Sequence, residues 1–204
     1  MSHRTYPPNR QLSQFIMDQF PPDYVGWAVD VGASDGISVN TTFAMEETRR
    51  WTVLSVEANP DFGRALKSCR AFVHMCAVGA EEGSGTFHVN DTNLESFSSL
   101  KPTSRTDVDG ISSARFRAIE VPIWTLDGLL ALWQFPRLDV LCIDTEGTEL
   151  DVLKGCDLAR WQPRVIVTEC WDAVGPIDLY LEGFGYVKSA RNVHNDIFIH
   201  GGKK

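Results

Sequence analysis

The sequence predicts an α/β fold in which a mostly parallel β-sheet carries helices on both faces and has an antiparallel hairpin at its C-terminal edge. Three observations predict this class. Short apolar runs alternate with segments of helical periodicity, as in proteins built from β-α-β units. A glycine-containing turn follows the first apolar run. The C-terminal segment 183–200 instead holds two runs of alternating polarity, around residues 190–192.

The first half of the chain supplies three helices and three strands. Apolar residues at helical spacing predict helices over 11–20, 37–50 and 61–70, and Pro21 and Pro22 end the first of them. The runs between them are short and continuously apolar, which predicts strands buried on both faces. These runs are WAVDVGASDG, WTVLSVEANP and AFVHMCAVG.

The second half continues the alternation after one long polar segment. Residues 86–89 predict a short strand, and the stretch of about 90–117 has no sustained period, as in a lid or substrate-binding loop. Further strands are expected over 118–124, 138–144 and 165–170, and helices over 126–133, 149–154 and 176–182. We find no internal repeat, so 1–204 is expected to be a single domain.

Composition excludes several classes of protein. The chain has 204 residues, a net charge of −8 and 43% hydrophobic residues, which is typical of a soluble globular domain. No apolar stretch approaches the roughly 20 residues that a membrane span needs. The acidic balance disfavours nucleic acid as a partner, because phosphate binding needs clustered positive charge. Five cysteines without a C-x-x-C pair indicate a reduced, cytoplasmic protein.

The first strand leads into Asp30-Val31-Gly32-Ala33-Ser34-Asp35-Gly36. Gly32 and Gly36 allow a sharp turn and a close approach of a ligand to the backbone. Their G-x-x-x-G spacing differs from the G-x-G-x-x-G of dinucleotide folds, which favours a carboxylate-bearing ligand such as S-adenosylmethionine over a pyrophosphate. A purely structural pair of glycines is an equally common explanation.

Glu57 ends the second strand, 21 residues after Gly36. An acidic residue at this position is placed to accept hydrogen bonds from both hydroxyls of a ribose. The alternative is a solvated carboxylate that caps the next helix with Asn59 or Asp61. Glycine turn and acidic strand end together predict a ribose-bearing cofactor at the carboxyl ends of the strands.

Asp144 and Glu146 stand two residues apart at the end of a later strand, so both side chains can point to the same face. They could act as a general base, or hold a divalent cation such as Mg²⁺, with Glu169 as a third carboxylate. In the structural alternative, Glu146 and Thr148 cap the helix over 149–154.

These motifs together resemble the FkbM-type S-adenosylmethionine-dependent methyltransferases. The resemblance rests on VDVGASDGISVNTT, SVEANP, CAVG, WTLDGLL, LDVLCIDTEGTELDVLKGCD and PRVIVTE, which follow one another in the family's order. The most specific part is I-D-x-E-G-x-E-x-x-V-L-K-G. Two positions depart from the family: Cys142 replaces a usual lysine, and Ile16 and Met17 follow S-Q-F where a glycine and an acidic residue are usual.

The resemblance implies a Rossmann-like class I methyltransferase fold with a seven-stranded sheet whose last strand is inserted antiparallel. It implies transfer of a methyl group to a hydroxyl of a sugar, a glycan or a related small molecule. The cofactor-binding residues that it implies are Asp30, Gly32, Ala33, Asp35, Gly36, Glu57, Ala58, Cys76, Ala77 and Asp144. The catalytic or metal-binding residues are Asp144, Glu146 and Glu169.

Other residues are weaker candidates. Ser96, Ser98 and Ser99 lie in a serine-rich stretch, and His194 could serve as a base. Trp171 could stack on a sugar ring. The cations Lys101, Arg105, Arg115 and Arg117, set against Asp107 and Asp109, could receive an acidic acceptor, although a solvated loop is the simpler reading.

Two further functions stay open at this point. The first is a nicotinamide-dependent oxidoreductase, against which the absent third glycine and the I-D-x-E-G block count. The second is a non-catalytic cofactor-binding module that acts with a partner. Because the chain is short, we also expect that a homo-oligomer or another protein completes the acceptor pocket.

Overall fold

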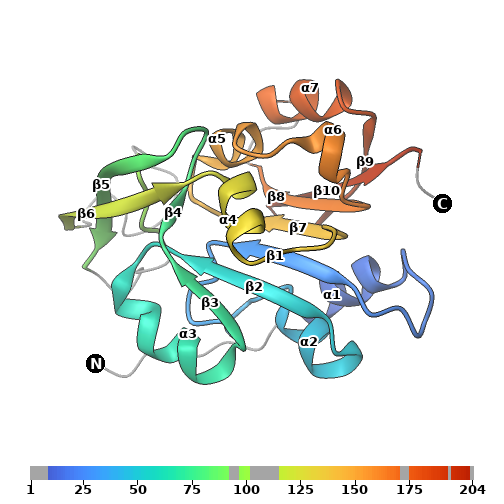
Figure 1. Cartoon of the computed structure of the whole chain (residues 1–204), viewed down its shortest axis with the longest axis horizontal. Helices are drawn as coiled ribbons and strands as arrows, with labels where there is room; N and C mark the ends of the chain where they lie inside the picture. The colour runs from blue at the N-terminus through green and yellow to red at the C-terminus, as the bar shows by residue number, and fades with distance from the viewer. Residues whose placement is uncertain (1–8, 92–96, 102–114, 171–174, 193, 203–204) are drawn as a thin grey trace.

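The computed structural model describes residues 9–91, 97–101, 115–170, 175–192 and 194–202. Its main sheet has seven strands in the order β3-β2-β1-β7-β8-β10-β9 (Figure 1). The pairs among β3, β2, β1, β7 and β8 are parallel, whereas β10 runs antiparallel to both β8 and β9. The predicted fold class is therefore confirmed. The strands are β1 (Trp27–Val31), β2 (Thr52–Glu57), β3 (Phe72–Met75), β7 (Val140–Ile143), β8 (Val165–Glu169), β9 (Tyr186–Asn192) and β10 (Asn195–His200).

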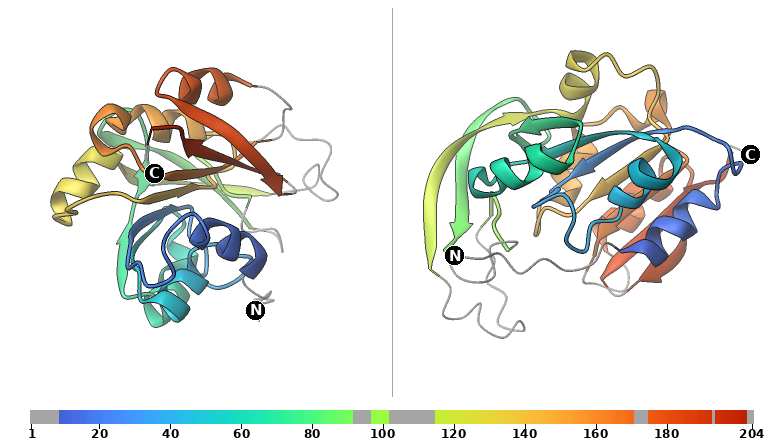
Figure 2. Two further views of the ribbon diagram at one scale, coloured as in Figure 1. Left: turned by 90° about the vertical axis from the view of Figure 1, so that its right-hand side faces the viewer. Right: turned by 90° about the horizontal axis from the view of Figure 1, so that it is seen from below.

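Helices cover both faces of this sheet (Figures 1 and 2). On one face lie α1 (Arg10–Met17), α2 (Phe43–Arg49) and α3 (Gly63–Cys69), which follows the 3-10 turn η1 (Pro60–Phe62). On the other face lie α4 (Leu126–Leu132), α5 (Glu149–Lys154), α6 (Leu158–Trp161) and α7 (Pro176–Glu182). Because both faces are covered, β8 is buried along its whole length, and this explains the apolar run of residues 165–167 before the polar end of the strand.

A second, three-stranded sheet lies at one end of the main sheet, in the order β4-β6-β5 (Figure 1). It consists of β4 (Ala77–Val78), β5 (Gly83–Asn90) and β6 (Phe116–Trp124). The sequence predicted one strand over the run AFVHMCAVG, but this run is broken at Cys76, so that β3 joins the main sheet and β4 the second sheet. The strand expected over 86–89 is likewise longer and pairs with β6 throughout.

The helix predicted over 37–50 begins only at Phe43, and residues 37–42 form a turn. Side chains hold this turn in place of helical bonds. The carboxylate of Asp35 accepts hydrogen bonds from the N–H groups of Ile37 and Ser38 at 2.9 and 2.7 Å. Val39 has a φ of +54°, which is incompatible with a helix.

Smaller differences concern element ends. The helix expected over 11–20 ends at Met17, and α6 was not expected at all. The C-terminal hairpin turns between Asn192 and Asn195, not at 190–192, so both strands are longer than the alternation suggested. Among the described residues, no helix has both the length and the apolar character needed to cross a bilayer.

Candidate active site

A cavity of about 700 Å³ lies at the carboxyl ends of β1, β2, β7 and β8. This is the edge at which open α/β sheets bind ligands, and the volume is in the range of small-molecule sites. Phe87 of β5 and Leu100 close part of it from the side of the second sheet. The predicted cofactor residues that line it are Asp30, Gly32, Ala33, Asp35, Glu57, Ala58, Cys76, Ala77 and Asp144, and Gly36 lies outside it.

The two glycines of the first turn are required by contacts within the protein itself. Gly32 has a φ of +87°, and a Cβ atom added there would lie 1.8 Å from the carbonyl oxygen of Asp144. At Gly36 the φ is +84°, and a Cβ would lie 2.8 Å from the Sγ of Cys69 and from a methyl carbon of Leu66 on α3. Glycine therefore lets β1 turn directly against the end of β7 and against α3.

A buried polar network fixes the side chain of Asp30. Its Oδ2 accepts hydrogen bonds from the side chains of Asn40 and Thr42, both at 2.8 Å. The guanidinium of Arg70, whose side chain is fully buried, lies 3.9 Å from Asp30 and 2.6 Å from Glu46. Burial raises the pKa of Glu46, and Arg70 opposes that shift. Sequence reasoning missed Arg70 and Asn40, because nothing in their local spacing marks them.

Glu57 stands at the cavity wall and fixes the turns on either side of it. Its two carboxylate oxygens accept hydrogen bonds from the N–H groups of Ser34 at 2.7 Å and Asn59 at 2.6 Å. Burial raises the pKa of Glu57 to about 6, although both of these hydrogen bonds lower it. Each oxygen of a carboxylate can accept more than one hydrogen bond, so Glu57 retains capacity for two hydroxyl groups.

One end of the cavity is lined by small and apolar side chains. They are Ala58, Phe62, Cys76, Ala77, Val78 and Phe87. Burial raises the pKa of the Cys76 thiol to about 12, so this cysteine is neutral and unreactive at physiological pH. Burial also raises the pKa of Cys142, the residue in place of the family's usual lysine. The surface is therefore suited to the faces of a heteroaromatic ring.

The three predicted carboxylates come together. One oxygen from each of Asp144, Glu146 and Glu169 lies within 4.8 Å of the other two. The cause is not the alternation of an extended strand, because β7 ends at Ile143 and Glu146 has a left-handed φ of +57°. A turn directs Asp144 and Glu146 toward Glu169, which ends β8. Such a cluster can take up a proton or ligate a divalent cation.

The capping role considered for Thr148 is wrong. Thr148 makes no side-chain capping hydrogen bond at the start of α5. Glu149, the first residue of α5, fixes the turn before the helix, because its Oε1 accepts hydrogen bonds from the N–H groups of Thr145 and Gly147, both at 3.0 Å.

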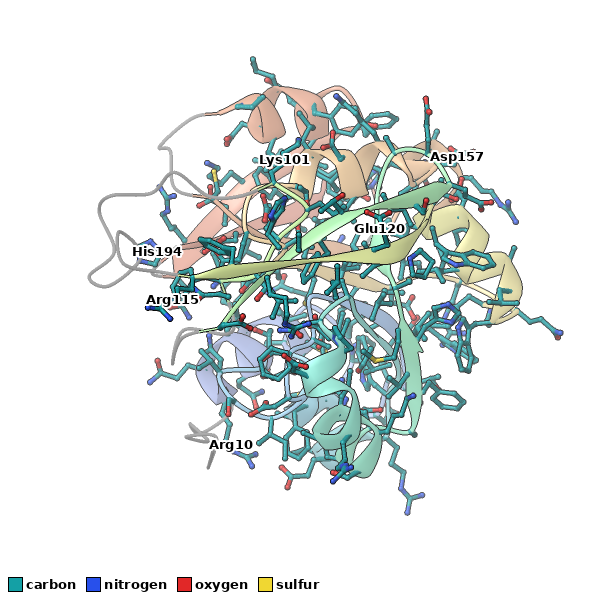
Figure 3. All side chains as sticks on the ribbon, turned by 90° about the vertical axis from the view of Figure 1, so that its left-hand side faces the viewer. Arg10, Lys101, Arg115, Glu120, Asp157 and His194 are labelled. Carbon is teal, nitrogen blue, oxygen red and sulfur yellow. The ribbon has the colours of Figure 1, made fainter. Side chains whose placement is uncertain are left out.

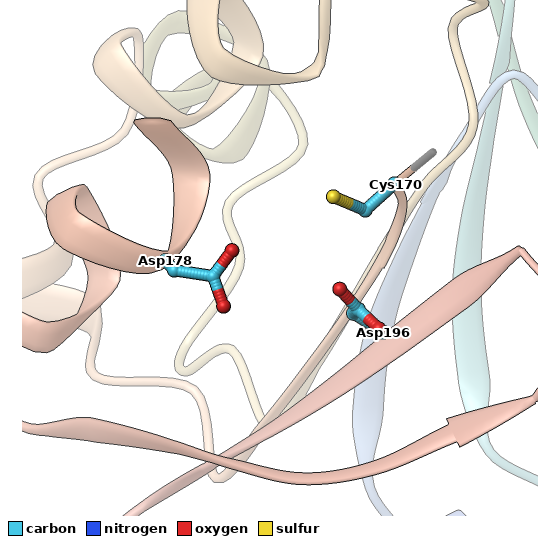
Figure 4. A group of neighbouring side chains, drawn as sticks. All are labelled: Cys170, Asp178 and Asp196. Carbon is cyan, nitrogen blue, oxygen red and sulfur yellow. The ribbon is translucent and has the colours of Figure 1, made fainter. Parts of the chain in front are cut away.

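A second group, Cys170, Asp178 and Asp196, has the spacing of a metal site (Figure 4). Its charges are already balanced by cationic side chains. The Nζ of Lys188 lies 2.5 Å from Asp178 and 2.8 Å from Asp196, and Arg191 lies 3.2 Å from Asp196. This group therefore ties α7 to the β9–β10 hairpin and is no candidate for metal binding.

Two of the weaker candidates make hydrogen bonds within the protein, and one of these, Ser98, also lines the cavity. Ser98 accepts a hydrogen bond from the N–H of Asn90 at 2.9 Å, and Ser99 donates one to the carbonyl of Thr145 at 3.1 Å. His194 is exposed at the margin of the molecule (Figure 3). Ser96, Arg105, Asp107, Asp109 and Trp171 lie outside the described residues.

Two of the basic side chains of the polar loop are paired with carboxylates, whereas Arg115 is exposed and Arg105 lies outside the described residues. Lys101 lies 2.6 Å from Asp151, and Arg117 lies 2.8 Å from Asp61. The cavity wall itself carries carboxylates, from Asp30, Asp35, Glu57, Asp144 and Glu146, and no lysine, arginine or histidine among its described residues. Such a wall favours a ligand with a positive charge and disfavours a pyrophosphate.

Comparison with known proteins gave consistent matches. A model of the methyltransferase FkbM domain matches residues 30–188. The methyltransferase sdnD of Sordaria araneosa is 43% identical over 54 residues, which cover 24% of this chain and 21% of that protein.

Solved structures show a similar fold at low sequence identity. The methyltransferase FkbM from Methylobacillus flagellatus KT superposes with a TM-score of 0.60 at 16% identity, over 97% of this chain and 49% of that one. The methyltransferase domain of METTL16 gives a TM-score of 0.52 at 10% identity, over 98% and 69% of the two chains. The chain thus spans about half the length of the first of these structures.

Proposed function

This chain belongs to the FkbM methyltransferase family, and on that premise we propose that it transfers a methyl group from S-adenosylmethionine to a hydroxyl of a sugar, a glycan or a related small molecule. The observation that carries the proposal is one cavity that joins the glycine turn, Glu57 and Asp144. Cofactor-binding and proton-accepting groups thus line the same space, as methyl transfer requires.

The wall of the cavity fits the proposed donor. Glu57 has acceptor capacity for both ribose hydroxyls, and the apolar end around Ala58 and Cys76 suits the adenine. The donor carries a sulfonium and an ammonium against one carboxylate, so its net charge is positive, as the acidic wall favours. The two negative phosphates of a nicotinamide dinucleotide would meet the same wall unfavourably.

When bound, S-adenosylmethionine supplies a methyl group made electrophilic by its sulfonium sulfur. The protein's part is to position the acceptor and to remove its proton. We assign proton removal to Asp144, whose carboxylate takes the hydroxyl proton as the oxygen forms its bond to the methyl carbon. Glu146 and Glu169 would hold the acceptor hydroxyl or a divalent cation such as Mg²⁺ beside it.

The test is Asp144→Asn, assayed for release of S-adenosylhomocysteine and for its binding by calorimetry. We expect turnover to fall about 10²- to 10⁴-fold, the usual contribution of a general base, with affinity for S-adenosylhomocysteine nearly unchanged. Asp151→Asn is the matched control, because Asp151 is paired with Lys101 outside the cavity. Near-normal turnover of Asp144→Asn would remove this residue from the chemistry.

A metal role is separated from a base role by chelation. If the cluster holds a catalytic cation, EDTA abolishes the activity of the wild type and added Mg²⁺ restores it. If Asp144 acts as a base alone, activity survives EDTA. Titration with NAD serves as a control on the proposal itself, since tight binding of NAD without binding of S-adenosylhomocysteine would exclude a methyltransferase.

A further inference from the structure

Asn195 is a polar residue of the cavity wall that the sequence analysis did not single out. It is half-buried, begins β10 and pairs in register with Glu169 at the end of β8. Directly paired residues of antiparallel strands point their side chains to the same face. The carboxamide of Asn195 therefore stands beside the cluster of Asp144, Glu146 and Glu169.

The next residue shows that this orientation is specific. Asp196 is fully buried and forms ion pairs with Lys188 and Arg191, so it serves the structure of the hairpin. Asn195 has the opposite orientation, because successive residues of a strand alternate between faces. Within the described part of the chain, no side-chain hydrogen bond of Asn195 is formed. Its amide is thus available to a ligand.

The chemistry of this amide complements that of the cluster. Ionised carboxylates only accept hydrogen bonds, whereas a carboxamide both donates and accepts them, as a hydroxyl does. A molecule with a single hydroxyl at Asp144 would leave Asn195 unused. A molecule with two adjacent hydroxyls would place one at the cluster and present the other to the amide.

The charge of the wall also limits the acceptor. Its described residues bring several carboxylates and no basic side chain, and Lys101 and Arg117 of the polar loop are paired with Asp151 and Asp61. An acceptor with a phosphate or carboxylate near its reacting hydroxyl would be repelled.

We propose that Asn195 binds a second acceptor hydroxyl, and that the acceptor is a neutral compound with adjacent hydroxyls, such as an uncharged sugar. This inference rests on the proposed methyl transfer and adds the acceptor class to it. Asn195 would set acceptor orientation and would leave donor binding to Glu57 and the glycine turn.

The experiment uses neutral methyl pyranosides, their singly deoxygenated analogues, and the corresponding uronic acids and sugar phosphates, with release of S-adenosylhomocysteine measured. We expect transfer to the neutral diols and not to the charged sugars. For Asn195→Leu we expect kcat/KM on the best diol to fall about tenfold to a hundredfold, the cost of leaving one polar group unpaired, mainly through KM.

Two variants serve as controls. Asn192→Leu alters the same residue type in the same hairpin, outside the cavity wall, and should leave kcat/KM unchanged. Asn195→Asp has the same size but lacks the donor, so it keeps the test valid if the leucine variant fails to fold. We expect it also to lose activity on the diol.

The results separate the two proposals. Binding of S-adenosylhomocysteine together with equal activity of Asn195→Leu and Asn192→Leu would overturn the role of Asn195. Preference for charged sugars, or no transfer to any sugar, would overturn the acceptor class, and the donor site would stand. Absence of S-adenosylhomocysteine binding to the wild type would overturn the proposed function itself.

Discussion

Acidification from about pH 8 to about pH 5 should weaken binding of S-adenosylhomocysteine about tenfold, because Glu57 gains a proton over that interval. The free carboxyl has a pKa of about 6, raised by burial. Its oxygens already accept hydrogen bonds from the N–H groups of Ser34 and Asn59. Only the ionised form has the capacity to accept both ribose hydroxyls as well.

The magnitude follows from the pKa. One unit below it, about one carboxyl in eleven is ionised, so the apparent affinity falls about elevenfold, or roughly 1.4 kcal/mol. Two units above it, nearly all carboxyls are ionised and affinity is at its maximum. One proton should be released for each ligand bound near pH 5, and none near pH 8.

Calorimetry in buffers of different ionisation enthalpy measures both the affinity and this proton release. Glu57→Gln is the control, because its side chain has the same length and does not titrate. We expect weaker binding by this variant and no pH dependence between pH 5 and 8. A wild-type affinity that stays constant over the interval, or a Gln variant that keeps the slope, would refute the assignment of Glu57 to the ribose.

The same pKa makes the opposite prediction for the stability of the free protein. A folded-state pKa above the unfolded value favours the protonated form of the folded chain. The stability contributed by Glu57 is therefore full below about pH 4.5 and is lost as the pH rises through about 6, by up to roughly 2 kcal/mol. Thermal shifts with and without ligand separate the two effects.

Two further predictions concern the frame of the site and are checked by urea unfolding. Gly32→Ala should destabilise the protein by about 3 kcal/mol or more, because its Cβ would overlap the carbonyl of Asp144. Gly147→Ala is the control: Gly147 has a φ of +107° and open space around it, so the variant should cost only about 1–2 kcal/mol of backbone strain. Arg70→Met should cost about 3–5 kcal/mol, since it leaves the buried Asp30 and the half-buried Glu46 without their cation. Arg64→Met, on the exposed side of α3, should change stability little, and equal losses in the two variants would contradict the network.

The main sheet could be predicted from the sequence because its signals are local. A parallel strand covered on both faces is mostly apolar, as VLCI in β7 is. The second sheet gives no such signal. Its strand β4 has two residues, and pairing with β6 brings Ala77 next to Ile123, far along the chain. Only the folded arrangement defines that strand.

The first turn shows how side chains override a periodic pattern. Residues 37–50 have helical spacing, but the side-chain oxygen of Asn40 accepts hydrogen bonds from the N–H groups of Thr42 and Phe43, which a helix over 37–50 would bond to carbonyls four residues earlier. Asn and Asp compete with helices in this way. The expected helix N-terminus at the glycine turn is therefore absent from the described structure, and a ligand there would meet the turn itself.

Some residues of the site could likewise be predicted from local sequence, and others could not. Glu57 ends β2 and Asp144 directly follows β7, and such positions can be predicted from the sequence because the carboxyl ends of parallel strands meet at one edge of the sheet. Arg70 and Asn195 depend on tertiary packing. Arg70 reaches Asp30 from the end of α3, and Asn195 meets the carboxylates only through the register of β10 on β8. No local pattern reports such a register.

The acidic cluster links donor binding to proton removal. One oxygen from each of Asp144, Glu146 and Glu169 lies within 4.8 Å of the other two, so negative charges on this cluster repel one another at a cost in free energy. A nearby positive charge lowers that cost. The sulfonium of the donor would bring such a charge into the cavity that Asp144 lines. Donor binding would therefore favour the ionised form of the carboxylate that accepts the proton from the acceptor hydroxyl. A neutral cofactor bound in the same place would lack this effect, which makes the acidic wall a feature suited to sulfonium chemistry in particular.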